Sequence, residues 1–269
     1  MIAPILDADE FAGRVCVVTG AARGIGAAIA ESLARLGGTV IVADINLEGA
    51  AERSEILAGE GLDATPWQLD VRDAAGIDEL VSGVTERLGP PTVLINNAGI
   101  VTVAPSDQLA EDEWRRQVDV MLTGTFLTTQ AVARTMLAGE GGAIVNLSSI
   151  GALGGHPGRS AYNAAKAGIS CLTQVLGVEW AARGVRVNAV APAVTRTEML
   201  EHVLRTLEGA TRRAEYAQRT PMGRVAEPEE IAGCVAFLAS RKASFITGTT
   251  LLIDGGWMAS TGIPAEAGG

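Results

Sequence analysis

The chain is poor in the residues that build disulfide frameworks and metal centres. It has three cysteines and two histidines in 269 residues. Cys16, Cys171 and Cys234 lie far apart and form no C-x-x-C pair, so we expect them to be small core residues in a reducing compartment. His156 and His202 belong to no H-E-x-x-H motif, which argues against a dedicated zinc site. We therefore predict no catalytic metal.

Long apolar runs and an excess of basic residues are also missing. No apolar run reaches the length of about eighteen residues that a membrane span needs. The start, M-I-A-P-I-L-D-A-D-E, carries no basic leader. The formal net charge of −10 and a pI near 4.8 argue against the clustered Lys and Arg of a nucleic-acid site. We expect a cytoplasmic protein that binds neither a membrane nor a nucleic acid.

The chain is instead rich in apolar residues arranged in a regular alternation. Hydrophobic residues make up 48% and charged residues 19%. This composition is sufficient for one large buried core, and we expect a single domain over residues 1–269. Strand-like and helix-like segments alternate throughout, with one long helix expected over 112–137. This order predicts an α/β fold, with seven parallel strands covered by helices on both faces. Residues 1–12 and 258–269 are expected to be loose termini.

A glycine-rich turn follows the first predicted strand. R-V-C-V-V-T at 14–19 leads into G-A-A-R-G-I-G and then a segment of helical period. Gly20, Gly24 and Gly26 would let the backbone approach a pyrophosphate, and the amino end of the helix would face its negative charge. Glycine also forms ordinary tight loops, but the strand before and the helix after favour a dinucleotide site in a Rossmann-type, doubly wound sheet.

Asp44 ends the second predicted strand, twenty residues after Gly24. A carboxylate there can accept hydrogen bonds from the adenosine ribose and would repel a 2′-phosphate, which favours NAD over NADP. Arg23 argues in the other direction, because a guanidinium in the glycine turn could bind a 2′-phosphate. Asp44 could also cap the following helix, or do both. We give Asp44 more weight and predict NAD.

A hydroxyl, a phenol and an ammonium occur in S-I-G-A-L-G-G-H-P-G-R-S-A-Y-N-A-A-K, residues 149–166. If Tyr162 opens a helix, Lys166 lies one turn later on the same face. A nearby cation would lower the pKa of the phenol from its usual value of about 10 and make it a usable acid or base. Ser149 follows an apolar segment, so we expect its hydroxyl at the carboxyl end of a buried strand. A Tyr-x-x-x-Lys pair by itself is common in helices.

Together these motifs resemble the short-chain dehydrogenase/reductase family over residues 12–257. The Ser-Ser pair at 148–149, Tyr162, Lys166, T-G-x-x-x-G-x-G, N-N-A-G at 96–99 and the closing D-G-G carry the resemblance. It implies an NAD-dependent oxidoreductase of secondary alcohols or ketones in which Ser149, Tyr162 and Lys166 are catalytic. The cofactor contacts that it implies or supports are Gly20, Arg23, Gly24, Ile25, Gly26, Asp44, Ile45, Asp70, Val71, Asn97, Ala98, Gly99, Tyr162, Lys166, Thr195 and Thr197.

Two positions depart from the family pattern. Met121 stands where the family usually has Asn, a residue implicated in the bend and bound water that connect the catalytic lysine to solvent. A thioether is only a weak acceptor, so either the main-chain carbonyl holds that water or Met121 simply packs as core. We hypothesise slower or differently pH-dependent turnover. Ala193 replaces the usual glycine after Pro192 and restricts positive φ, so the loop is expected to take a different path.

Residues 194–220 resemble the substrate loop of the family. We expect Met199, His202 and Val203 to influence specificity, whereas His156 and Arg159 flank the site and could equally be solvated loop residues. G-G-H-P-G-R-S-A-Y and E-W-A resemble sugar and polyol dehydrogenases of the family, and cyclic or steroid-like ketones are the alternative substrates.

The family resemblance also implies a homotetramer built through the long helices and the C-terminal segment. The competing hypothesis for function is a non-catalytic NAD-binding regulator. Met121 and Ala193 give it some weight, while the intact Ser149, Tyr162 and Lys166 count against it.

Overall fold

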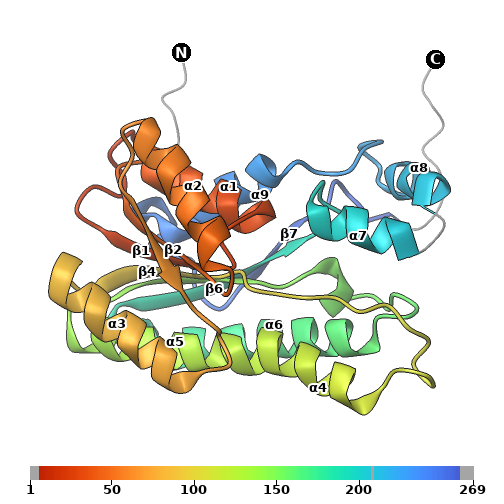
Figure 1. Ribbon diagram of the computed structural model, residues 1–269, viewed down its shortest axis with the longest axis horizontal. Helices are drawn as coiled ribbons and strands as arrows, with labels where there is room; N and C mark the ends of the chain where they lie inside the picture. The colour runs from red at the N-terminus through yellow and green to blue at the C-terminus, as the bar shows by residue number, and fades with distance from the viewer. Residues whose placement is uncertain (1–5, 207–208, 261–269) are drawn as a thin grey trace.

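The computed structural model describes residues 6–206 and 209–260, apart from the side chains of residues 206 and 209–213. They form a seven-stranded sheet between two layers of helices (Figure 1). The strand order is β3-β2-β1-β4-β5-β6-β7, and every neighbouring pair is parallel. This confirms the predicted Rossmann-type α/β fold. The strands are β1 Val15–Thr19, β2 Thr39–Asp44, β3 Ala64–Gln68, β4 Pro91–Asn96, β5 Gly142–Leu147, β6 Val185–Pro192 and β7 Thr250–Ile253.

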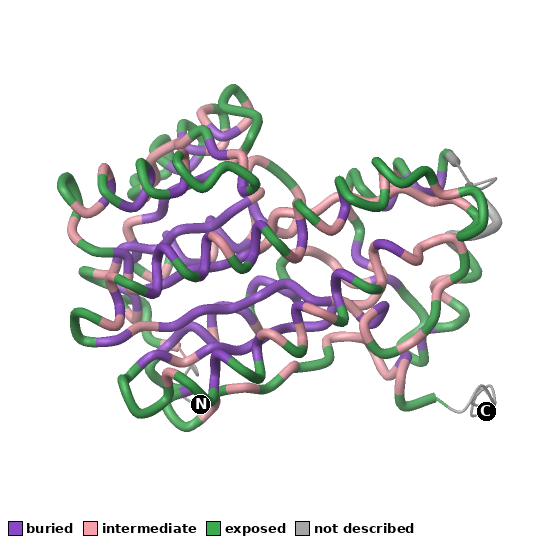
Figure 2. Tube along the Cα trace, turned by 90° about the horizontal axis from the view of Figure 1, so that it is seen from below, coloured by how far each residue is buried: buried purple, intermediate pink, exposed green. Residues whose placement is uncertain are grey.

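Both faces of the sheet are apolar and each is covered by its own helices, because successive side chains of a strand point to opposite faces. Cys16 and Val18 of β1 belong to the core on one face, and Val15 and Val17 to the core on the other. Buried residues follow the sheet and the inner sides of the helices (Figure 2). The first face is covered by α1 Gly24–Arg35, α2 Leu47–Gly59 and α9 Pro228–Ala239, and the second by α3 Ala74–Leu88, α5 Gly124–Ala138 and α6 Ser160–Trp180.

The long helix expected over 112–137 is interrupted. It consists of α4 Glu111–Val118, a π-helical turn at Asp119–Thr123 and then α5. A π turn contains an extra residue, which rotates the side chains that follow it relative to those before. Met121 lies in this turn and is completely buried against Ala165 and Ile169 of α6. The expectation of one continuous helix, which rested on periodicity, is therefore wrong at this turn.

The amino-terminal segment corrects another expectation. Residues 6–12 form turns, and Phe11 is completely buried while its main-chain N–H donates to the Leu36 carbonyl at 2.8 Å. At the other end, the main-chain N–H of Met258 donates to Asp254 Oδ2 at 2.8 Å. The remaining parts of the expected loose ends, residues 1–5 and 261–269, lie outside the described residues.

The three cysteines are free thiols in different environments. Cys16 is buried, and burial raises the pKa of its thiol to about 12. Cys234 is half-buried, whereas Cys171 is exposed on α6, so the expectation of a core residue is wrong for Cys171. Among the described helices, none combines the length and apolar character needed to cross a membrane.

A buried polar ladder links the two central strands to the helices beneath them. Asn96 Nδ2 donates to Asn146 Oδ1 and to Thr129 Oγ1, both at 2.8 Å. Asn146 Nδ2 in turn donates to Thr173 Oγ1 at 2.9 Å. These side chains are at most 4% exposed. Because each finds its partner, the ladder fixes β4 and β5 relative to α5 and α6 just below the carboxyl edge of the sheet.

Candidate active site

The candidate site lies at the carboxyl edge of the central strands, where open parallel sheets bind ligands. The glycine turn follows β1, Asn97 follows β4, Ser148 and Ser149 follow β5, and Ala193 follows β6. The strand order reverses direction between β1 and β4. Two cavities open at this edge, one beside the glycine turn and one beside Tyr162.

The glycine turn has the geometry that a pyrophosphate site requires. Gly20 and Gly24 adopt φ angles of 63° and 59°, which other residues rarely adopt. A Cβ on Gly26 would lie 2.2 Å from the Gly20 carbonyl oxygen. At the start of α1, Arg23 makes no side-chain capping bond and the first turn contains no acid. The first helical N–H groups therefore lack a side-chain acceptor and could bind an anion, so the turn fits a dinucleotide.

Asp44 is held in place by backbone donors rather than by a helix cap. Its Oδ2 accepts from the Ala22 N–H at 3.1 Å and its Oδ1 from the Asn46 N–H at 3.0 Å. The cap of α2 is Asn46, whose Oδ1 accepts from Gly49 N at 3.3 Å. The capping alternative for Asp44 is therefore wrong. The carboxylate lines the cavity beside the glycine turn.

This cavity, which we call the dinucleotide cavity, has a volume of about 430 Å³. Most of the predicted cofactor residues line it. Gly26 lies behind the turn, and Ser149, Tyr162, Lys166 and Thr195 line the other cavity. The predicted residues that line the dinucleotide cavity are Gly20, Arg23, Gly24, Ile25, Asp44, Ile45, Asp70, Val71, Asn97, Ala98, Gly99 and Thr197.

Sequence reasoning missed further lining residues, of which Arg72, Arg116 and Glu198 are charged. Arg72 forms a 2.6 Å ion pair with Asp70, and its hydrogen bonds hold the pKa of that carboxyl below its usual value. Arg116 pairs with Glu113 at 2.8 Å. The short spacing Asp-x-Arg at 70–72 was a usable signal for the first pair. The other missed residues are Leu69, Ile100 and Val120, whereas Met199, expected to influence specificity, also lines this cavity.

Asn97 ties the end of β4 to the glycine turn. Its Nδ2 donates to the carbonyls of Thr19 at 3.0 Å and Gly20 at 2.8 Å. Thr19 Oγ1 accepts from the N–H groups of Asn97 at 3.1 Å and Ala98 at 3.2 Å. A Cβ on Gly20 would lie 2.8 Å from Ala98 Cα. The two segments that line the dinucleotide cavity are therefore packed as one unit.

The other cavity, which we call the substrate cavity, has a volume of about 160 Å³ and brings Ser149, Tyr162 and Lys166 together. Ser149 Oγ accepts from the Gly151 N–H at 3.0 Å, and Tyr162 and Lys166 extend from the first turns of α6. Lys166 Nζ lies 5.7 Å from the centroid of the Tyr162 ring and donates to the Leu147 carbonyl at 2.5 Å. The predicted convergence of these three groups is present.

The pKa shifts of the pair differ from the expectation. Burial raises the pKa of Tyr162, and a hydrogen bond with Ser149 and the charge of Arg159 offset part of that effect. Burial also lowers the pKa of Lys166 to about 8. Lys166 is not among the causes of this raised pKa, and its amine donates to the Leu147 carbonyl. The expected lowering of the phenol pKa by Lys166 is therefore wrong for this structure.

The first turns of the substrate loop close the top of both cavities. The loop contains α7 Glu198–Thr206 and α8 Gly209–Arg219. Met199 and Val203 line the substrate cavity as expected, but His202 is exposed and does not, because it lies on the outer side of α7. Arg23 forms a 2.7 Å ion pair with Glu198, which joins the glycine turn to the start of α7.

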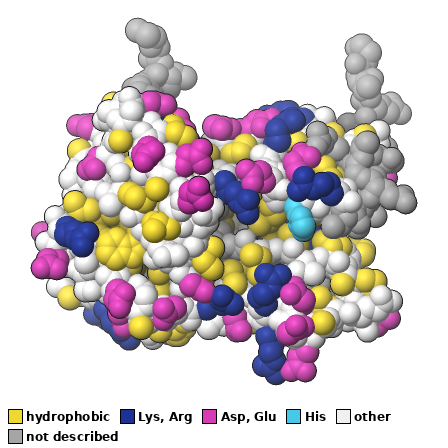
Figure 3. All heavy atoms as spheres, viewed as in Figure 1, with side chains coloured by type: hydrophobic (Ala, Val, Ile, Leu, Met, Phe, Trp, Pro, Cys, Tyr) yellow, Lys and Arg dark blue, Asp and Glu magenta, His cyan; other side chains and the backbone are white. Residues whose placement is uncertain are grey.

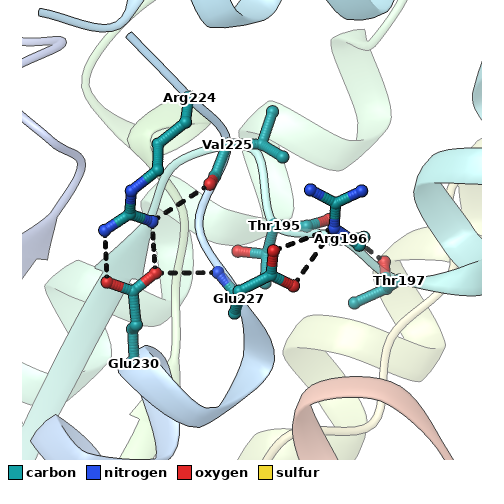
Figure 4. Close-up of polar contacts among 7 residues, drawn as sticks. All are labelled: Thr195, Arg196, Thr197, Arg224, Val225, Glu227 and Glu230. Atoms are coloured by element: carbon teal, nitrogen blue, oxygen red, sulfur yellow. Dashed lines mark hydrogen bonds and ion pairs between the residues drawn. The ribbon is translucent and has the colours of Figure 1, made fainter. Parts of the chain in front are cut away.

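Both ends of the substrate loop are fixed by one network (Figure 4). Thr195 pairs with Ala226 in an isolated parallel bridge, and Arg196 Nε donates to the two carboxylate oxygens of Glu227 at 2.9 and 3.1 Å. Arg224 binds both oxygens of Glu230 at 2.6 and 2.7 Å. The Leu200 N–H donates to Thr197 Oγ1 at 3.3 Å. Thr195 and Thr197 are thus held at the cavity walls.

The two departures from the family pattern have simple structural surroundings. Met121 packs between the N-N-A-G turn and α6, so the packing account of this residue is favoured. The Ala193 N–H donates to the Ile253 carbonyl at 3.0 Å, which continues the pairing of β6 with β7 beyond Pro192.

The fold and the site together define a dinucleotide-binding oxidoreductase. The family model described as enoyl-(acyl carrier protein) reductase matches residues 20–258. The chain is 43% identical over 252 residues to the cis-4-hydroxycyclohexanecarboxylate dehydrogenase of Sinomonas cyclohexanicum, covering 93% of this chain and 99% of the relative. It is 40% identical over 245 residues to the D-threitol dehydrogenase of Mycolicibacterium smegmatis, covering 91% and 93%.

A solved structure gives the same result. The gluconate 5-dehydrogenase of Burkholderia cenocepacia, in complex with NADP and tartrate, superposes with a TM-score of 0.89 at 33% identity, covering 94% of this chain and 99% of that one. The chain belongs to the short-chain dehydrogenase/reductase family. It is an NAD(P)-type oxidoreductase that acts on secondary alcohols.

Proposed function

We propose that the protein is an NAD-linked dehydrogenase that interconverts a secondary alcohol, such as a sugar, a polyol or a cyclic alcohol, and its ketone. The observation that carries the proposal is the meeting of the two cavities. Ser149, Tyr162 and Lys166 line one, the glycine turn lines the other, and Ile25, Asn97 and Gly99 line both. A dinucleotide on the glycine turn would extend along these shared residues toward the phenol.

The three side chains have complementary tasks in this proposal. Tyr162 exchanges the hydroxyl proton of the substrate, since its raised pKa keeps the phenol protonated at neutral pH and able to donate to a ketone oxygen. Ser149 hydrogen-bonds the same oxygen and orients it. Lys166 bonds the ribose of the cofactor and supplies positive charge near the phenol when oxidation requires it to ionise. The nicotinamide supplies the hydride acceptor or donor.

The preference for NAD rests on Asp44. Both of its oxygens accept backbone N–H groups, so the carboxylate stays beside the adenosine part of the dinucleotide cavity. Arg23, the opposing signal, is already engaged by Glu198, and Arg72 by Asp70. A 2′-phosphate would therefore meet the fixed negative charge of Asp44, while the exposed pair of Arg23 with Glu198 is too weak to decide the preference. Turnover of one alcohol with NAD and with NADP measures this preference, and a higher kcat/KM with NADP would contradict it.

We also propose the homotetramer. Val175 and Val178 on α6 and Leu251 and Leu252 on β7 are exposed apolar residues on the two kinds of element expected to form its interfaces. Phe245, at the start of the connection to β7, is fully exposed. Light scattering of the purified protein should give four times the chain mass of 27.7 kDa, and a monomer mass would contradict the proposal.

Tyr162→Phe is the direct test of the catalytic assignment. General acid-base assistance contributes a factor of about a hundred to ten thousand, so kcat should fall by that amount with each substrate of an alcohol panel. Dinucleotide affinity, measured by calorimetry, should change by no more than about three-fold because the glycine turn is untouched, and this serves as the control. Nearly full dehydrogenase activity in Tyr162→Phe would remove Tyr162 from the mechanism.

A further inference from the structure

The substrate cavity is electropositive although the protein is acidic. Its charged or titratable lining consists of His156, Arg159 and Lys166, together with the phenols of Tyr162 and Tyr216. Among the described residues that line it, none is an aspartate or a glutamate. This contrasts with a net charge of −10 for the whole chain and with the face in Figure 3, where acidic and basic side chains are interspersed.

Arg159 differs from the arginines of the dinucleotide cavity because it has no carboxylate partner among the described residues. Arg23, Arg72 and Arg116 each form an ion pair with an acid. The guanidinium of Arg159 instead donates from Nη2 to the hydroxyl of Tyr216 at 3.1 Å. A guanidinium has five N–H donors in a planar fork that matches a carboxylate. Its remaining donors are therefore available for an anionic ligand.

Three segments far apart in the sequence hold this end of the cavity. Arg159 is the residue immediately before α6, Tyr216 comes from α8, and Trp257 follows β7. The Trp257 ring lies 6.3 Å from the Tyr216 ring and 6.4 Å from the His156 ring, and Arg219 lies 4.7 Å above it. Burial and the charges of Arg159 and Arg219 lower the pKa of His156. The wall is thus a packed, positively charged unit.

The location of Arg159 separates this wall from the cofactor phosphates. Arg159, His156 and Tyr216 line the substrate cavity but not the dinucleotide cavity. Arg159 comes three residues before Tyr162, and its charge acts on the Tyr162 phenol. Because both side chains line the same cavity, an anion on Arg159 would belong to the molecule whose oxygen meets Tyr162.

We propose that Arg159, with Tyr216 and His156 beside it, binds a carboxylate of the substrate, so that the protein acts on hydroxy acids and the corresponding oxo acids. This inference rests on the proposed dehydrogenase function and narrows its substrate class. In the oxidation the carbinol carbon would give a hydride to bound NAD⁺, and the hydroxyl proton would pass to Tyr162 after its phenol has released its own proton to solvent. The products are the oxo acid, NADH and a proton, and the carboxylate on Arg159 is unchanged.

Matched pairs of substrates test the proposal. Gluconate and glucitol differ in one terminal group, carboxylate against CH₂OH, and cis-4-hydroxycyclohexanecarboxylate can be compared with its carboxamide. Loss of the hydrogen bonds between a guanidinium and a carboxylate should weaken substrate binding by roughly ten- to hundred-fold. The wild type should favour the acid of at least one pair by about ten-fold or more in kcat/KM. Arg159→Met should raise KM for that acid by about ten- to hundred-fold more than KM for the neutral partner, because the loss of the Arg159 charge beside Tyr162 affects both substrates alike. Arg159→Lys should recover part of the loss.

A matched control and a second measurement keep the test independent of turnover. Arg183→Met removes an exposed arginine outside both cavities and should leave both substrate types unaffected. Calorimetry of the NAD-loaded protein with cyclohexanecarboxylate, which has no hydroxyl to oxidise, should show binding in the wild type that is lost in Arg159→Met.

Two results would overturn the carboxylate site. One is equal kcat/KM for acid and neutral partners in both pairs, with dehydrogenase activity present, which leaves the proposed function standing. The other is carboxylate binding that is absent, or unchanged in Arg159→Met. If neither acids nor neutral alcohols are oxidised with either dinucleotide, the proposed function fails, and the calorimetry alone supports or refutes the anion site.

Discussion

Replacing Gly26 by alanine tests how closely the glycine turn is packed. The added Cβ would lie 2.2 Å from the Gly20 carbonyl oxygen and 2.4 Å from Asn97 Nδ2. The optimal separation of non-bonded carbon atoms is about 3.5–4.0 Å, so the new Cβ, the Gly20 carbonyl or the Asn97 side chain must move by more than about 1 Å. Asn97 Nδ2 is bonded to the carbonyls of Thr19 and Gly20. Movement in either direction therefore disturbs the unit that joins the turn to β4.

The size of the effect follows from two opposing contributions. Alanine is better than glycine in a helix by about 0.5–1 kcal/mol, whereas overpacking typically costs about 1–3 kcal/mol, and a lost hydrogen bond adds about 1 kcal/mol. Gly26→Ala should therefore destabilise the protein by about 1–3 kcal/mol. Gly233, on the exposed side of α9, has nothing within 4 Å of an added Cβ. Gly233→Ala should stabilise by about 0.5–1 kcal/mol, which makes it the matched control.

Thermal unfolding and calorimetry with NAD measure both consequences. Each kcal/mol corresponds to about 2–4 °C in Tm for a chain of roughly this size, so Gly26→Ala should lower Tm and Gly233→Ala should raise it. NAD affinity should fall at least about ten-fold in Gly26→Ala and stay unchanged in Gly233→Ala. If Gly26→Ala keeps the Tm and the NAD affinity of the wild type, the close approach at this turn is not a property of the protein.

Three further predictions concern charge and burial. The pKa of Lys166 is about 8 in the folded protein, against 10.5 for a free lysine, so the unfolded chain binds more protons between these two pH values. Protein stability should therefore rise with pH across this range. In urea unfolding, Lys166→Met should be more stable than the wild type by about 1–3 kcal/mol at pH 7, and the difference should shrink toward pH 10. Arg224 and a backbone N–H lower the pKa of Glu230 to about 2, so the ionised Glu230 stabilises the fold above pH 4.5 and loses this effect as the pH falls to 2. Because the Arg224–Glu230 pair is exposed, Glu230→Gln should reduce the free energy of unfolding by only about 0.5–1 kcal/mol at pH 7 and leave it unchanged at pH 2. Met121→Asn should cost about 1–3 kcal/mol by burying an amide without changing the pH profile of kcat, and an altered profile would instead assign the side chain a part in proton transfer.

The arrangement of the main site could be predicted because short motifs follow parallel strands. Gly20, Asn97 and Ser149 each come just after a strand, and parallel strands end at one edge, so their convergence required no long-range information. The one-turn spacing of Tyr162 and Lys166 likewise fixed their common face. These features depend on local pattern and on the layer architecture alone.

The predictions that were wrong or missing concern properties that depend on the three-dimensional surroundings of a residue. The pKa of Tyr162 is raised chiefly by burial, and Lys166 Nζ donates to the Leu147 carbonyl; residue spacing reveals neither fact. The wall around Trp257 joins segments that are far apart in the sequence. The error at His202 has the same origin, because a spacing of three residues from Met199 is compatible with a shared helix face, and only the structure shows that His202 is exposed and outside the cavity lining.

The ion pair between Arg23 and Glu198 has a consequence for cofactor exchange. Its side chains are 74% and 69% exposed, and exposed pairs are typically worth about 0–1 kcal/mol, little more than thermal energy. The fastening between the phosphate turn and the first turn of α7 can therefore be undone almost without cost, and dissolved salt weakens it further. This ion pair should therefore contribute little to the barrier for release of the product dinucleotide, independently of the rate of the chemical step.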